Sequence, residues 1–308
     1  MNVQHLKYII EVQRTGSISQ AAENLYMSQP NLSKAIRELE AQMGLTIFRR
    51  TSKGIEVTAK GQVFLEHARQ ITAQIAALES LYKSGDSGKQ FFSISVPRSS
   101  YVAKAFSRFS ASLNESQPIE LDYMETNTMG TINNVINGRS NIGIIRFNKK
   151  YEDSFAKYLK EKRLIFSHLL EFTYLALMHR EHPLAGQPDL GPDQLKDYLE
   201  LIYGDCALPF AAEEREAYGN QPLGAKYIYL YERGSLFDLL SQNHRTYIWS
   251  PPLPAETLQR FDLVQRKCEA ADHIYCDMLI KEKHNNITAL EQRFLDELAA
   301  TRQELSTL

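Results

Sequence analysis

The residue types that could carry out covalent or metal chemistry occur in this sequence without the partners that such chemistry needs. His179 and His182 lie three residues apart, a spacing that can hold a metal ion, but no second pair of ligands accompanies them. Cys206 has no resolving cysteine near it, which favours a buried thiol over a reactive one. Residues 85–88 reproduce the Gly-Asp-Ser-Gly motif of trypsin-like proteases, but no suitable histidine and aspartate context precedes them. We therefore expect no catalysis, no metal and no cofactor.

A different chemistry, hydrogen bonding to the edges of nucleic-acid bases, is available on one short polar stretch. Ser28 can cap a helix, and Pro30 suits a first helical turn because its missing N–H costs little there. The apolar residues that would face inward are Leu32, Ile36 and Leu39, and the outward residues are Gln29, Asn31, Ser33, Lys34 and Arg37. Gln29 can read adenine, and Pro30 or Ser33 can touch a thymine methyl group.

Two helical segments precede this stretch, and together they predict a helix-turn-helix. Apolar residues follow helical spacing over 3–14, and Gly16 stands where that helix would end. Ser17 and Gln20 form the pattern of a capping box, so a second helix would begin at Ile18. The alternative at this point is an ordinary helical hairpin with a solvated polar face.

A basic hairpin after the third helix favours DNA binding over that alternative. Residues 45–48 and 54–57 alternate as two short strands around a turn that holds Arg49, Arg50 and Lys53. Such a wing would meet the sugar-phosphate backbone. Residues 1–60 carry eight Lys or Arg against five Asp or Glu, whereas the whole chain has a net charge of −2. A basic N-terminal segment thus precedes an acidic body.

From Thr58 onward the chain returns to helical spacing with the apolar seam of a coiled coil. The seam positions step alternately by four and three, and they are Phe64, Ala68, Ile71, Ile75, Leu78 and Tyr82. The stripe could pack on its own domain, but residues 84–88 have the composition of a flexible linker. We expect the helix to project and pair with a second copy, so that two recognition helices meet a palindromic site.

The rest of the sequence alternates strands and helices, which indicates parallel sheets with helices on both faces. A first set of strands and helices is expected at 91–96, 99–113, 119–124, 128–137 and 142–147. A second set begins at 169–178 and continues through 201–203, 225–231, 236–242 and 246–249. A last strand at 274–280 and a last helix at 288–300 are expected to return to the first lobe. The expected fold class is α/β overall, with a winged helix-turn-helix at 1–58, a linker helix and hinge at 59–88, and a two-lobed domain at 89–308 (lobe I 89–163 and 272–308, lobe II 164–271).

The N-terminal segment resembles the DNA-binding domain of LysR-type transcriptional regulators. The matching residues are Gly16-Ser17-Ile18, Ala21-Ala22, Leu25, the run from Ser28 to Ser33, Ile36, Leu39-Glu40, Gly44-Leu45, Phe48-Arg49-Arg50, Thr58 and Gly61. The resemblance implies groove contacts by Gln29, Pro30, Ser33 and Lys34, and wing contacts by Arg50 and Lys53. It also implies a body similar to periplasmic binding proteins, which binds a small effector between its lobes.

Polar residues stand where the strands of the first lobe would end, which is where open α/β sheets bind ligands. By the same resemblance Ser99, Ser100, Thr128 and Arg146 fall at positions of the effector pocket, and Tyr203 would face them from the second lobe. We expect a small anionic or polar effector. The alternatives are that Ser99 and Thr128 only cap helices and that Arg146 belongs to a surface ion pair.

These features together favour a ligand-controlled, DNA-binding regulator that is not an enzyme. Its expected partners are double-stranded promoter DNA, a small-molecule effector, further copies of itself as a homodimer or homotetramer, and RNA polymerase. A cytoplasmic location is expected, because no apolar stretch approaches the roughly 20 residues of a membrane span and no signal peptide is evident. The rival interpretation is a solute-binding or enzymatic α/β protein whose N-terminal segment only mediates assembly.

Overall fold

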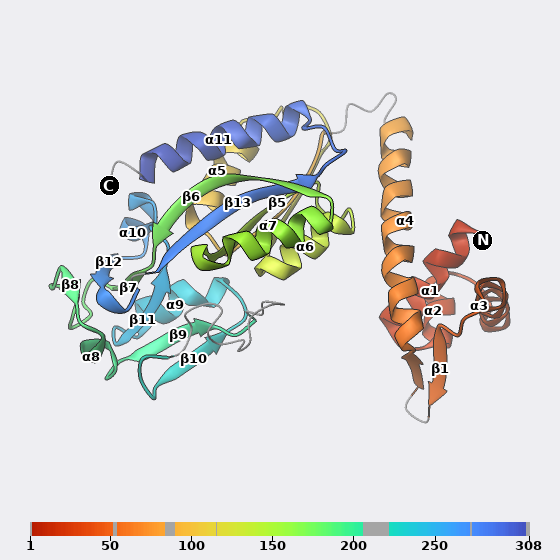
Figure 1. Cartoon of the computed structure of the whole chain (residues 1–308), viewed down its shortest axis with the longest axis horizontal. Helices are drawn as coiled ribbons and strands as arrows, with labels where there is room; N and C mark the ends of the chain where they lie inside the picture. The colour runs from red at the N-terminus through yellow and green to blue at the C-terminus, as the bar shows by residue number, and fades with distance from the viewer. Residues whose placement is uncertain are drawn as a thin grey trace. The chain divides into compact units, whose positions relative to one another are not determined.

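The computed structural model describes residues 2–51, 54–83, 90–114, 116–205, 222–271 and 273–305. The chain divides into two compact units, one built mainly from residues 1–88 and the other from residues 89–308 (Figure 1). Each unit has hydrophobic cores of its own. Within the described ranges, no helix is both long and apolar enough to cross a lipid bilayer.

The N-terminal unit contains three helices, a two-stranded wing and a long fourth helix, as the sequence predicts. Its elements are α1 (Val3–Thr15), α2 (Ile18–Asn24), α3 (Gln29–Met43), β1 (Phe48–Thr51), β2 (Gly54–Val57) and α4 (Ala59–Lys83). One core joins them, and its fully buried members include Leu6, Ile9, Leu32, Leu39 and Ile47. β1 and β2 pair antiparallel with Thr51 opposite Gly54.

Local capping differs from the predicted pattern at two helix N-termini. The Ser17 hydroxyl accepts a hydrogen bond from the Gln20 N–H, as expected, but the Gln20 amide donates to Glu23 instead of returning to Ser17. The Thr15 hydroxyl oxygen accepts the Ser17 N–H in its place. Ser28 has the extended backbone of an N-cap residue, yet its hydroxyl makes no capping hydrogen bond. Both helix starts and the bond to the Ser17 hydroxyl were therefore predicted correctly, whereas the return bond from Gln20 and the cap by Ser28 were not.

The first sheet of the C-terminal unit has the strand order β4-β3-β5-β13-β6. The strands are β3 (Gln90–Val96), β4 (Ile119–Glu125), β5 (Ile142–Asn148), β6 (Leu164–Thr173) and β13 (Ile274–Glu282), and the helices around them are α5 (Ser100–Ala111), α6 (Thr128–Ile136), α7 (Glu152–Glu161) and α11 (Ala289–Leu305). β3, β4 and β5 run parallel, but β13 is antiparallel to both of its neighbours, so the sheet is mixed and not purely parallel as expected.

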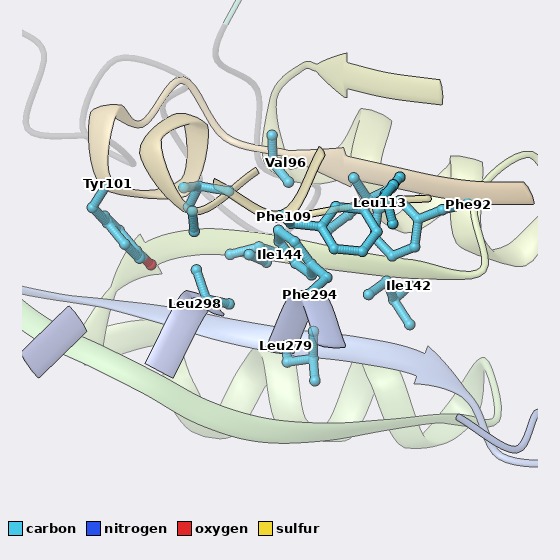
Figure 2. Packing of buried hydrophobic residues seen from close by; sticks show 13 residues of the cluster. Phe92, Val96, Tyr101, Phe109, Leu113, Ile142, Ile144, Leu279, Phe294 and Leu298 are labelled. Carbon is cyan, nitrogen blue, oxygen red and sulfur yellow. The ribbon is translucent and has the colours of Figure 1, made fainter. Parts of the chain in front are cut away.

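Two cores lie on opposite faces of this sheet because successive side chains of a strand point to opposite sides. Ile142 and Ile144 of β5 pack with residues of α5 and α11, whereas Ile145 packs with residues of α6 and α7. On the first face the rings of Phe92 and Phe294 lie 5.2 Å apart between the sheet and α11 (Figure 2). Helices thus cover both faces, as the sequence predicts.

The second sheet has the strand order β10-β9-β11-β7-β12-β8. The strands are β7 (Leu175–His179), β8 (Asp189–Leu190), β9 (Leu199–Tyr203), β10 (Tyr227–Leu230), β11 (Thr246–Ser250) and β12 (Leu263–Cys268), and the helices are α8 (Pro192–Leu195), α9 (Gly234–Gln242) and α10 (Ala255–Arg260). This sheet is also mixed, since β7 runs antiparallel to β11 and β12.

The chain passes from the first sheet to the second at Tyr174, and this corrects the expected lobe boundary. The segment 169–178 contains the end of β6 and all but the last residue of β7, and these strands belong to different sheets. β6 pairs with β13 from Leu164 to Thr173, so assigning 164–173 to the second lobe was wrong. No glycine or proline stands between β6 and β7, and the sequence therefore carries no local signal for the change of sheet.

Gly61 is a point of close approach between α4 and the residue before the wing. A Cβ built on Gly61 would lie 2.3 Å from the Ile47 carbonyl oxygen, and that oxygen already accepts the Thr58 N–H. We expect Gly61→Ala to lower the free energy of unfolding by about 1–2 kcal/mol, because a steric cost of about 2–3 kcal/mol outweighs about 1 kcal/mol of better helix propensity. Urea denaturation followed by circular dichroism measures the change.

The matched control for this prediction is Glu66→Ala, an exposed position on the same helix. It should change the free energy of unfolding by less than about 0.5 kcal/mol. A Gly61→Ala protein as stable as the control would contradict the close approach.

Candidate nucleic-acid interface and ligand cavity

The residues predicted to contact DNA bases gather on the solvent side of α3 and at its N-terminus. Gln29, Pro30, Asn31, Lys34 and Arg37 are exposed, and Ser33 is half-buried. The Gln29 amide donates to the Ser33 hydroxyl at 2.9 Å, and the Arg37 Nε donates to the Ser33 carbonyl oxygen at 3.3 Å. These bonds restrict the long side chains before any ligand is present, which lowers the entropy lost on contact.

The wing, which follows α3 in the sequence, carries the predicted cations. Arg49 is exposed on β1, and the backbone of Arg50 pairs with Ile55, while Lys53 lies outside the described residues. The Glu40 carboxylate on α3 accepts the Ile47 and Phe48 N–H groups at 2.6 and 3.1 Å. Sequence reasoning assigned Glu40 no role, yet it ties the start of the wing to α3.

Tyr26 is a second residue that sequence reasoning passed over. It lies in the turn between α2 and α3, has a left-handed backbone with φ 52° and is 99% exposed. A bulky residue in that conformation is unfavourable without a compensating contact. The available signal was an aromatic residue inside the short turn of residues 25–28, where polar or glycine residues are usual.

The residues of the predicted dimerisation seam differ in burial between the first and second halves of α4. Ala68 is buried in the core of its own unit, and Phe64 and Ile71 are partly buried against the same core. The expectation that Ala68 lies on a free face is therefore wrong. Ile75 is half-buried, and the side chains of Leu78 and Tyr82 lie outside the described part of the chain.

A cavity of about 110 Å³ lies within the C-terminal unit and is lined by residues of both sheets. This volume is several times that needed for one water molecule. Four of the five predicted effector residues line it, namely Ser100, Thr128, Arg146 and Tyr203. The apolar part of the lining includes Leu177, Leu201, Leu236, Ile248 and Leu253. Burial raises the pKa of Tyr203 to about 12, so its phenol stays protonated at neutral pH.

Ser99 and Thr128 bond differently from simple helix caps. Ser99 occupies the N-cap position of α5, but its hydroxyl makes no capping bond and is buried without a hydrogen-bond partner among the described residues. The Thr128 hydroxyl donates to the Arg146 carbonyl oxygen at 2.5 Å. Asn127 caps α6 instead, since its Oδ1 accepts the Gly130 N–H at 2.8 Å. The capping interpretation of Thr128 was wrong.

Arg146 lies within β5 and forms a buried ion pair with Asp277 of β13. Its Nε and Nη2 each donate to a carboxylate oxygen of Asp277 at 2.7 Å, and the Tyr101 hydroxyl donates to the same carboxylate at 2.8 Å. Burial alone would lower the pKa of Arg146, but the Asp277 carboxylate reverses this and raises the pKa. The surface ion pair considered for Arg146 was therefore wrong, because Asp277 is fully buried.

Two further ion pairs cross from one lobe to the other beside the cavity. Arg98 donates to both carboxylate oxygens of Asp205 at 2.9 and 2.8 Å. Arg233, which precedes α9, donates to Glu125 at the end of β4 and to the Ser100 hydroxyl, both at 2.7 Å. Sequence reasoning missed Arg233 and Glu125, although Glu125 stands at the carboxyl end of a strand.

His179 and His182, whose spacing could hold a metal ion, do not belong to one cluster of possible ligands. The ligand atoms that approach each other belong to His179, Glu181 and His244, and His182 is not among them. The rings of His179 and His244 stack at 3.8 Å with an angle of 3° between their planes. The lone pairs of two parallel stacked rings cannot point at one ion, so this group lacks the geometry of a metal centre. Cys206 and the linker at 84–88 lie outside the described residues.

The comparison with known proteins identifies the N-terminal unit. Residues 3–62 match the model of the bacterial regulatory helix-turn-helix proteins of the lysR family. The N-terminal unit thus carries a helix-turn-helix domain of the lysR family. The HTH-type transcriptional regulator TfdT of Cupriavidus pinatubonensis is 41% identical over 75 residues, which are 24% of this chain and 33% of TfdT. BudR of Raoultella terrigena is 29% identical over 219 residues, 70% of this chain and 71% of BudR.

The fold of the whole chain is that of full-length LysR-type regulators. The crystal structure of CbnR, a LysR family transcriptional regulator, superposes with a TM-score of 0.63 at 16% identity, over 98% of this chain and 99% of CbnR. The expectation of a winged helix-turn-helix followed by a two-lobed α/β domain is thereby confirmed. The sequence match to TfdT spans only a third of that protein, and it is confined to about a quarter of this chain.

The buried pair in the cavity wall gives a test of what stabilises the C-terminal unit. We expect Asp277→Ala to lower the free energy of unfolding by about 3–5 kcal/mol, because it leaves the Arg146 charge buried without a partner. The matched control is Glu171→Ala, which removes the exposed partner of Lys149 and should cost less than about 1 kcal/mol. Guanidinium denaturation measures both, and equal losses would contradict the role of the buried pair.

Proposed function

We propose that this protein is a DNA-binding transcriptional regulator whose binding to promoter DNA is controlled by a small molecule held between two α/β lobes. The observation that carries the proposal is the exposed polar face of α3 beside a basic wing, within the segment that matches the lysR family model. CbnR, which has the same fold, has been crystallised at full length with its target DNA. That complex supports the proposal that the same elements bind DNA here.

The proposed division of labour on DNA follows from chemistry. Gln29 and Ser33 would meet base edges in the major groove, because an amide can donate and accept at once and so read adenine. Arg50 and Lys53 would contact phosphates, which adds affinity that depends on salt and not on sequence. Two copies joined through α4 would present two such surfaces to a palindromic site. Ile75 and the residues beyond it are the candidates for that contact.

The remaining expectations complete the proposal. We propose that the domains run approximately from 1 to 58, 59 to 88 and 89 to 308, that the protein acts in the cytoplasm as a homodimer or homotetramer, and that it meets RNA polymerase at the promoter. Catalysis is not part of the proposed function, since the relatives described above are transcriptional regulators. The cavity of the C-terminal unit is the proposed effector site, and Ser100, Thr128 and Tyr203 are the polar residues proposed to bind there.

Base reading is tested by Gln29→Ala, with Gln42→Ala as the control at the opposite end of the same helix. We expect Gln29→Ala to lose about 1–3 kcal/mol of discrimination against single-base changes in the preferred site, because one bidentate contact disappears. Gln42 is exposed on the last turn of α3, so its variant should keep the wild-type preference. Selection from random duplexes followed by gel shifts on single-base variants measures the difference.

Backbone contact is tested by Lys53→Ala in the same assay across a range of salt concentrations. The affinity should fall similarly for all sequences, and the slope of log K against log salt should shrink by about one. A wild-type protein that selects no sequence-specific, salt-sensitive complex would overturn the regulator proposal. It would favour the rival in which the N-terminal unit only mediates assembly.

A further inference from the structure

The cavity contains positive groups, but its described lining residues offer no unneutralised guanidinium. Arg98, Arg146 and Arg233 all line it, and each is bonded to a carboxylate of the chain itself. The carboxylate partners are Asp205, Asp277 and Glu125, respectively. An anionic ligand therefore gains a guanidinium here only by displacing one of these three internal carboxylates.

The three carboxylates differ in the free-energy cost of separating them from their arginine partners. Asp277 is fully buried inside β13 and also accepts the Tyr101 hydroxyl, so its departure would leave a buried charge without a partner. Glu125 belongs to β4, a strand fixed by its ladder with β3. Asp205 lies two residues beyond the end of β9, and its side chain is the most exposed of the three, at 26%. Asp205 is the carboxylate that can move into water at least cost.

Arg98 keeps its position without Asp205. Its guanidinium lies over the Tyr203 ring, 4.5 Å from the ring centre, and its Nη2 also donates to the Tyr231 carbonyl oxygen at 2.6 Å. The two N–H groups that face the Asp205 carboxylate form the parallel fork that binds any carboxylate in two-point fashion. Removal of Asp205 would thus expose a preformed receptor for a carboxylate.

We propose that Asp205 is a tethered substitute for the acidic group of the ligand. The cavity takes a small carboxylic acid with an apolar body, and the ligand carboxylate replaces that of Asp205 at Arg98. The apolar body would contact Leu177, Leu201 and Ile248, which line the cavity and belong to one hydrophobic core. This inference rests on the proposed role of the cavity as the effector site.

The exchange has a structural consequence. Arg98 comes from the first lobe and Asp205 from the second, so the incoming acid breaks one of the three ion pairs that join the lobes among the described residues. The Arg233 pair with Glu125 remains, and so does the bond from the Asn127 amide to the Asp205 carbonyl oxygen at 2.7 Å. Ligand binding is thereby coupled to the way the two lobes are held together.

The test uses the full-length protein, calorimetric titration, and two probes of nearly equal shape, 4-methylpentanoate and its amide, 4-methylpentanamide. Asp205→Asn keeps the size of the side chain but removes the competing charge. We expect it to bind the acid at least about tenfold more tightly than the wild type does, because the internal competitor acts at high effective concentration. The affinity for the amide should stay the same.

Two further variants make the test specific. Glu256→Gln removes a carboxylate that pairs with Lys104 across the lobes, away from the cavity lining, and should leave the preference for acid over amide unchanged. Arg98→Lys removes the guanidinium fork and should weaken acid binding at least about tenfold while sparing the amide. Arg98→Lys keeps the test decisive if Asp205→Asn fails to fold.

The proposal is overturned if Asp205→Asn leaves the affinity for the acid unchanged, or if Glu256→Gln gives the same gain. It is also overturned if neither probe binds any variant. A gel shift with the selected DNA, run on the same preparations, separates this failure from that of the regulator proposal. If DNA binding is intact but the affinity for the acid does not rise, the proposal about Asp205 fails and the regulator proposal stands.

Discussion

The buried ion pair between Arg146 and Asp277 is the interaction on which the C-terminal unit and its cavity depend. It joins two strands that are far apart in the sequence, and burial makes the separation of its charges costly. Several groups of the cavity wall are held in place through this pair. The Thr128 hydroxyl donates to the Arg146 carbonyl oxygen, and the Arg146 guanidinium donates to the Arg98 carbonyl oxygen. The Tyr101 hydroxyl donates to the Asp277 carboxylate. The first lobe thus presents a rigid polar wall whose charges are already balanced.

The two units use charge in opposite ways, and the reason is what each would bind. Phosphates attract cations over a distance, and a surface meant for them gains from exposed side chains such as Lys34 and Arg37. A small cavity that held three free guanidiniums would be costly to close without a ligand. The chain neutralises each of them with its own carboxylates. The most exposed of these carboxylates, Asp205, is then the point at which we propose that a ligand competes.

Much of the fold could be predicted because its signals are local. Helix starts follow from residues such as Ser17, and the wing follows from two short alternating strands around a basic turn. The prediction failed where a decision depends on distant partners. The stretch 169–178 reads as one strand, but β6 is held by β13 and β7 by β11 and β12, so the chain changes sheets inside it. Ala68 likewise looked like a seam residue until α1 and α4 packed together around it.

The sequence by itself determined the LysR-type DNA-binding unit, the α/β class of the body and four of the residues that line its cavity. Spacing, capping residues and the rule that ligands bind beyond strand ends act over a few residues each, so they can be read without a structure. Only the tertiary structure decided which charges meet. The pairs of Arg98 with Asp205 and of Arg146 with Asp277 join residues more than a hundred positions apart. No local pattern encodes such a contact, because it exists only after both sheets have formed.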